Sequence, residues 1–135
     1  MSALSAFLHP TVTCEEKEVV ISRRFLGEDG KPVPFKIRAL TQEKNAAIIR
    51  TATRMKLVNG QLQESIDANE LSARTIVEAT VFPDFRSAEL CEAYGTKDPL
   101  QVPGKMLLAG EFGRLIDAVS KLSGFDKSLD EEAKN

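Results

Sequence analysis

The chain has 135 residues, of which 42% are apolar and 28% are charged, and this composition is typical of one globular domain that buries about two-thirds of its unfolded surface. Its 18 Lys and Arg residues against 20 Asp and Glu residues give a formal net charge of -2, which provides no long-range attraction to nucleic acid or anionic lipid. We therefore expect no nucleic-acid partner and no membrane partner, and no run of ~18 apolar residues is present that would span a bilayer.

The N-terminal segment carries no basic start before an apolar stretch, so it does not resemble a secretory signal. We expect an intracellular chain in which its two cysteines, Cys14 and Cys91, stay reduced. They form no CxxC spacing, and the single histidine, His9, cannot complete the usual zinc ligand set with them. The sequence thus predicts no metal site.

Residues 1–16 are predicted to form a flexible N-terminal arm. Leu4, Phe7 and Leu8 have the spacing of one helix face, but Pro10 follows them directly. Because proline interrupts a helix, we expect only a short helical turn in this arm.

The next apolar runs, residues 18–25 and 33–40, predict a β-hairpin. A Gly-containing turn separates them, and the second run alternates apolar and basic side chains, as in a strand with one buried face. Pro32 and Pro34 cannot donate to a strand ladder, so we expect the second strand to begin at a sheet edge.

A helix is predicted from Thr41, which can cap its N-terminus, to about Met55. Its apolar stripe would comprise Ile48, Ile49, Ala52 and Met55. Arg50 and Arg54 would lie on the opposite face, within a region, residues 36–56, that holds six basic residues and one acidic residue. Two interpretations stay open: a solvated basic face, or a surface for an acidic partner.

The dipeptide Asn59-Gly60 predicts a second, small hairpin at the surface. Residues 67–82 follow as the most apolar helix of the chain, with only a narrow polar strip, and we expect this helix in the middle of the core. Ile76 is one of its central apolar residues.

Two more helices are predicted toward the C-terminus. Ser87 can cap a short helix that ends at Gly95, and the last helix covers residues 111–123, with Gly124 as its stop. Residues 126–135 hold six charged residues and one large apolar residue, and are expected to form a disordered tail.

These elements predict an α+β fold that is mostly helical. We expect an N-terminal β-hairpin and a small second hairpin packed with a C-terminal helical bundle, in one domain over residues 17–125.

No constellation of catalytic residues is recognisable. A nucleophile with an adjacent base is not evident, the glycines do not form a phosphate-binding loop, and no cofactor motif occurs. Cys91 fits a small apolar gap on a short helix, and His9 fits a solvent-exposed position in the arm. We therefore predict a non-enzymatic protein without a cofactor.

Four stretches, in this order and spacing, resemble one family. They are residues 4–10 (LSAFLHP), residues 30–39 (GKPVPFKIRA), residues 81–85 (VFPDF) with the following AEL and YG, and residues 105–112 (KMLLAGEF) with the closing GFD. The chain resembles the XkdN-like tail assembly chaperones of phages and prophages of Gram-positive bacteria. The family's usual proline before Gly-Glu is replaced by Ala109, which leaves the start of the last helix less pre-organised.

The resemblance implies a chaperone that acts in the bacterial cytoplasm and is absent from the finished virion. Such chaperones bind the tape measure protein, a long, helical, aggregation-prone chain, and help to bring tail tube subunits to it. Self-association is a further possibility that the sequence leaves open. A partner for such a helical chain needs an apolar groove or patch that accepts an amphipathic helix.

Four apolar residues outside the regular predicted elements are candidates for this surface, together with the basic pair Arg50 and Arg54. They are Phe85, Met106, Leu107 and Phe125. The alternative is that these four side chains close the ends of the helical core. Two other functions stay open: a minor structural component of the tail, whose hairpins would pair edge to edge, and an enzyme that would depend on Cys91 or His9.

Overall fold

The computed structural model describes residues 3–11 and 16–125 and confirms the predicted α+β fold class. Its first element is the short helix α1 (Leu4–Leu8), which ends before Pro10. The flexibility of the arm over residues 1–16 stays a prediction. Cys14 and the predicted tail over residues 126–135 lie outside the described residues.

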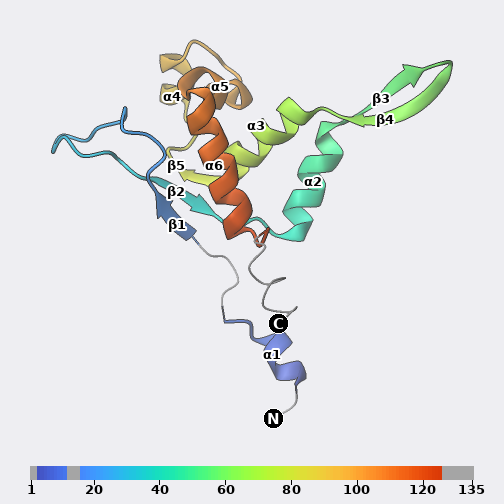
Figure 1. The fold of residues 1–135 in the computed structure, drawn as a ribbon, viewed down its shortest axis with the longest axis horizontal. Helices are drawn as coiled ribbons and strands as arrows, with labels where there is room; N and C mark the ends of the chain where they lie inside the picture. Colours follow the sequence, from blue (N-terminus) through green and yellow to red (C-terminus); the bar gives the residue numbers. More distant parts are fainter. Residues whose placement is uncertain (1–2, 12–15, 126–135) are drawn as a thin grey trace.

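A three-stranded antiparallel sheet forms one layer of the molecule (Figure 1). Its strands are β1 (Glu16–Val19), β2 (Phe35–Arg38) and β5 (Thr80–Phe82), in the order β1-β2-β5. The predicted pairing of the first two strands is confirmed, with Val19 opposite Phe35. The edge position expected for the second strand is wrong, because β5 pairs with its other side.

Both prolines precede β2, so neither occupies a position that must donate to the ladder. The two strands are also shorter than predicted, and residues 20–34 form the long connection between them. In this connection the amide of Arg24 donates to Ser22 Oγ at 3.0 Å. An isolated antiparallel bridge between Leu26 and Pro32 joins the two halves of this connection.

Helix α2 (Gln42–Ala52) begins at the predicted cap, where Thr41 Oγ1 accepts a hydrogen bond from the amide of Lys44 at 3.2 Å. It ends three residues before the predicted end at Met55. The chain continues directly into strand β3 (Thr53–Val58), which pairs with β4 (Gln61–Ile66) around the predicted Asn59-Gly60 turn. Both turn residues have positive φ, 51° and 80°, as a two-residue hairpin turn requires.

Helix α3 (Ala68–Ala79) confirms the predicted central helix, but it is shorter than residues 67–82. Asp67 accepts from the amide of Glu70 at 3.1 Å and caps the start. The last three residues predicted as helix form strand β5 instead. Thr80 and Val81 are β-branched, and the open side of β2 provides the hydrogen-bond partners that hold them extended.

The C-terminal part contains α4 (Ala88–Ala93), the 3₁₀-helix η1 (Pro99–Gln101), α5 (Val102–Met106) and α6 (Ala109–Leu122). Helix α4 is capped by Ser87 as predicted, and α6 covers most of the predicted last helix. The two short elements η1 and α5 were not predicted. Figure 1 shows that α6 lies across the body, in front of α3 and the sheet.

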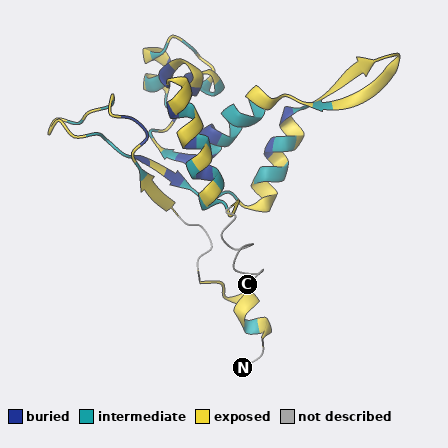
Figure 2. Ribbon diagram, in the orientation of Figure 1, coloured by how far each residue is buried: buried dark blue, intermediate teal, exposed yellow. Residues whose placement is uncertain are grey.

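The core lies where α3, α6 and the inner face of the sheet meet (Figure 2). Ile76 is fully buried there, as predicted. The buried residues of this core are Ile21, Phe35, Ile37, Ile76, Val77, Ala79, Phe85, Cys91, Val102, Met106, Leu107, Leu115 and Val119. The β3–β4 hairpin projects from this body beyond α2 and α3, and most of its residues are exposed.

Candidate functional site

Three of the four apolar candidates predicted to contact a partner lie in the core. Phe85 is fully buried, and Met106 and Leu107 are each 8% exposed. These three residues therefore follow the alternative interpretation, in which they close the core. The prediction that they bind a partner is wrong, because a partner cannot reach buried side chains on the folded surface. Cys91 is buried beside them, and its thiol donates to the carbonyl oxygen of Phe85 at 3.4 Å.

Phe125 is 68% exposed and lies at the mouth of a groove between α2, α3 and α6. This helical groove has a volume of about 390 Å³, within the ~300–1,000 Å³ range of ligand-binding clefts. Its lining comprises Leu40, Asn45, Ile49, Leu71, Ser72, Thr75, Ile116, Val119, Ser120, Ser123 and Phe125. The lining combines long apolar side chains with small polar ones, and such a surface suits the apolar face of an amphipathic helix.

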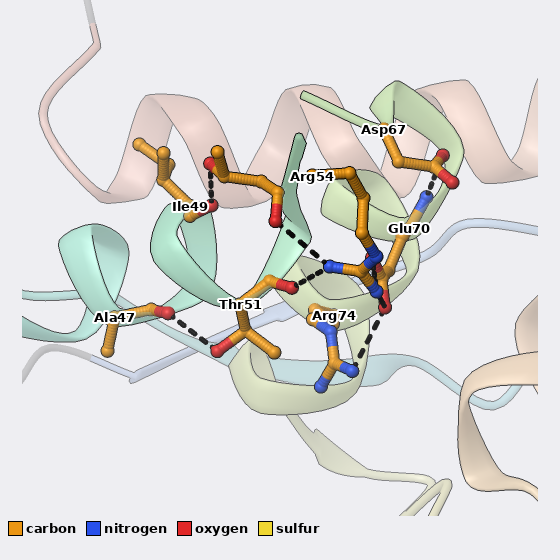
Figure 3. Close-up of polar contacts among 8 residues, drawn as sticks. Ala47, Ile49, Thr51, Arg54, Asp67, Glu70 and Arg74 are labelled. Atoms are coloured by element: carbon orange, nitrogen blue, oxygen red, sulfur yellow. Dashed lines mark hydrogen bonds and ion pairs between the residues drawn. The ribbon is translucent and has the colours of Figure 1, made fainter. Parts of the chain in front are cut away.

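The basic candidates Arg50 and Arg54 do not share a helix face, which corrects the sequence interpretation. Arg50 is exposed in the last turn of α2, and within the described residues it has no ion-pair partner. Arg54 belongs to β3, because the helix ends before it. Figure 3 shows its guanidinium between the carbonyl oxygen of Thr51 and the carboxylate of Glu70, 2.8 Å away.

Other basic residues of the region 36–56 also have partners within the chain. Arg38 and Lys44 both contact Glu78, and Lys36 contacts Glu16. Burial raises the pKa of Glu78, but the hydrogen bonds and charges of Arg86 and Lys44 outweigh burial and hold this pKa below its ordinary value. Most basic residues of this region therefore pair with acidic residues of the chain itself.

The sequence prediction missed an apolar face on the β3–β4 hairpin. In the register of the two strands, Met55 lies opposite Glu64, and Leu57 lies opposite Leu62. Residues directly opposite each other in an antiparallel pair point to the same side of the sheet. We call the side formed by Met55, Leu57, Leu62 and Ile66, together with Thr53 and Glu64, the hairpin face.

All four apolar side chains of the hairpin face are more than half exposed, from 51% for Ile66 to 72% for Leu57. The opposite side carries Arg54, Lys56, Gln61, Gln63 and Ser65, with Val58 as its apolar member. In residues 53–58 and 61–66, apolar and polar side chains alternate with a period of two, which indicates strands with one apolar side. The apolar face was missed because Met55 also fits the apolar stripe of the helix that was predicted to extend to this residue.

The base of the hairpin face adjoins the helical groove. Arg54 reaches Glu70, which also binds Arg74, and Arg74 lines a hollow to which α6 contributes no residue. Successive strand residues point to opposite sides, so Thr53 points away from the side of Arg54. The Oγ1 of Thr53 donates to the carbonyl oxygen of Ile49, a residue that lines the groove, at 2.7 Å. The hairpin face therefore begins beside the groove.

Within residues 3–11 and 16–125, no group of three or more His, Cys, Asp or Glu side chains is arranged to hold a metal ion. In the same part of the chain, no helix is both long enough and apolar enough to cross a membrane.

Comparison with known families shows which family this chain belongs to. The sequence model of the phage XkdN-like tail assembly chaperones matches residues 4–134. The chain belongs to this family. The family is one of chaperones for phage tail assembly, and the resemblance found in the sequence is confirmed.

Relatives of this XkdN-like chaperone occur in Bacillus subtilis strain 168. The protein YqbN is 38% identical over 130 residues, which cover 93% of this chain and 87% of YqbN. The phage-like element PBSX protein XkdN is 35% identical over 130 residues, covering 93% of this chain and 88% of XkdN. The crystal structure of YqbN superposes with a TM-score of 0.73 at 33% identity, over 90% of this chain and 96% of that one.

Proposed function

We propose that this XkdN-like chaperone binds the tape measure protein, keeps it soluble, and helps to recruit tail tube subunits. It acts in the cytoplasm of the bacterial host and is absent from the mature virion. The observation that carries the proposal is the family match over residues 4–134, which includes nearly every residue of the chain.

The helical groove supports this function physically. A tape measure protein is a long helical chain that covers little of its own apolar surface, so a chaperone must cover that surface in its place. Phe125 is exposed at the groove mouth, and Ile49 and Leu71 line the groove on α2 and α3. We place one apolar stripe of the client helix in this groove.

Co-expression tests the proposal. The tape measure protein of the same genome is expressed alone, with this chain, and with an unrelated chain of similar size and charge. We expect the tape measure protein to move from the pellet to the supernatant only with this chain, and to co-purify with it. Equal insolubility in all three samples would show that the proposed function is wrong.

A structural role in the tail is a second candidate, favoured by the two-stranded sheet β3–β4, whose outer edges pair with nothing in the described residues. Exposed strand edges can pair between copies in a ring. Mass spectrometry of purified particles distinguishes the two functions, because a chaperone is missing from particles and a tail component is present in stoichiometric amounts.

A further inference from the structure

We propose that the hairpin face binds one amphipathic helix of the tape measure protein, with a Lys or Arg of that helix placed against Glu64. This inference rests on the proposed function and adds a second contact surface, separate from Phe125 and the helical groove. The hairpin face has four apolar side chains that are more than half exposed, and only one charged side chain, Glu64.

The dimensions of the hairpin fit a helix. Each strand has six residues and is about 20 Å long at ~3.4 Å per residue. A helix of about 13 residues has the same length at ~1.5 Å per residue. Two strands ~4.8 Å apart present a ribbon about 10 Å wide, which matches the ~10–12 Å diameter of one helix.

The area of the hairpin face argues against a second copy as its stable partner. Four half-exposed side chains make an apolar patch on the order of a few hundred Å². A stable interface between two proteins needs about 800 Å² from each partner. Two hairpins stacked face to face would bury less than this, whereas a client helix can extend along the adjacent groove as well.

Charge gives the stronger reason. Glu64 lies opposite Met55, in the middle of the hairpin face, and no ion pair of Glu64 is found among the described residues. The basic residues of the hairpin, Arg54 and Lys56, point to the other side. Stacking two hairpin faces would therefore bury two carboxylates without a cation, which is strongly unfavourable. A helix with a Lys or Arg beside its apolar stripe satisfies the carboxylate.

The position of the hairpin face is consistent with one long client helix. Arg54, on the opposite side of the hairpin, is held by Glu70 (Figure 3), and Thr53, at the base of the hairpin face, donates from Oγ1 to the carbonyl oxygen of the groove residue Ile49 at 2.7 Å. Because Thr53 pairs with Ile66, the base of the hairpin face adjoins the groove at Ile49, and one client helix can contact both surfaces.

The first test compares two variants of equal charge in the full chain. Leu57→Glu with Leu62→Glu places two carboxylates on the hairpin face, and Gln61→Glu with Gln63→Glu places two on the opposite side. Each variant is co-expressed with the tape measure protein, and the amount of soluble complex and its dissociation constant are measured. We expect at least a tenfold loss of affinity, ~1.4 kcal/mol, for the leucine variant and less than a twofold change for the glutamine variant.

The second test concerns Glu64. Glu64→Gln removes one negative charge from the hairpin face, and Gln63→Lys makes the same change in net charge on the opposite side. We expect Glu64→Gln to weaken binding more at low salt than at high salt, because the lost contact is between charges. Equal effects of the two variants would overturn the role of Glu64.

A photo-crosslinking residue at position 57, compared with one at position 56, identifies the occupant directly. We expect position 57 to crosslink to a helical segment of the tape measure protein that contains Lys or Arg. Crosslinks to a second copy, or to the tube protein, would overturn the inference. If the wild-type chain does not solubilise the tape measure protein at all, the proposed function fails; if wild type and the leucine variant bind it equally, only the hairpin inference fails.

Discussion

Arg24 and Glu111 are 87 residues apart in sequence, yet Arg24 Nε donates to Glu111 Oε2 at 3.0 Å and its Nη2 donates to Oε1. The same Nη2 also donates to the carbonyl oxygen of Met106. Glu111 is 4% exposed and accepts a hydrogen bond from the amide of Leu108, where α6 begins. The Arg24–Glu111 pair fixes the β1–β2 connection to the junction of α5 and α6, and the Glu111 carboxylate also satisfies the backbone N–H of Leu108 at the start of α6.

Stability should depend on pH through Glu111. Hydrogen bonds from Arg24 and Ser22 lower its pKa from 4.5 to about 2. A carboxyl whose pKa is depressed by folding contributes stability that is complete above its unfolded pKa and is lost as the pH falls toward the folded pKa. We expect Glu111→Gln to lower the thermal midpoint at pH 7, and the difference from wild type to shrink between pH 5 and pH 2.

Glu92→Gln is the control for this titration, because Glu92 is exposed on α4. Its midpoint should follow that of the wild type across the whole pH range. A constant difference between Glu111→Gln and wild type from pH 7 to pH 2 would contradict the assigned role of the Glu111 carboxylate.

Ile76→Ala should lower the free energy of unfolding by about 2 to 5 kcal/mol, because it leaves a cavity beneath α3. Ile76 is fully buried. Ile66→Ala is the matched control, since the same atoms are removed from a side chain that is 51% exposed on the hairpin. Urea unfolding measures both, and a loss below ~1 kcal/mol for Ile76→Ala would place this residue outside the core.

Phe125→Glu should weaken the complex with the tape measure protein without lowering the thermal midpoint by more than a few degrees. Phe125 is 68% exposed, so the folded chain loses little packing. Leu26→Glu, at an exposed apolar residue away from the groove, is the control. Unchanged affinity of the Phe125 variant would show that the helical groove is not part of the binding surface.

Arg50→Glu should weaken the same complex more at low salt than at high salt, if the client carries acidic residues beside its apolar stripe. Exposed charges are screened over ~10 Å at 0.1 M salt. Arg54→Glu is a different experiment, because it places a carboxylate against Glu70 and should lower stability at the base of the hairpin. If Arg50→Glu binds the client as tightly as the wild type at low salt, Arg50 belongs to a solvated basic face and not to the binding surface.

Local signals in the sequence were sufficient for the main helices and the hairpin turn. Caps such as Thr41 and Ser87, and the positive-φ pair Asn59-Gly60, act on their own neighbours, so they predict an element without knowledge of the rest of the fold. The apolar periodicity of α6 and the central position of α3 were predicted for the same reason. Of the candidate site residues named from the sequence, Phe125 and Arg50 are exposed, whereas the sequence alone left open whether Phe125 closes the core.

Tertiary contacts decided the rest. Thr80, Val81 and Phe82 continue a helical pattern, and they are extended only because β2 offers an unpaired side to them. Phe85, Met106 and Leu107 lie outside long elements in the sequence, but segments distant in the chain close over them. The hairpin face was hidden because Met55 suits a helix and a strand equally, and the end of α2 at Ala52 selects the strand. Caps, turns and periodicity depend on near neighbours in the sequence, so the sequence by itself determined them. Burial depends on residues far apart in the sequence, so only the tertiary structure decided which side chains are buried.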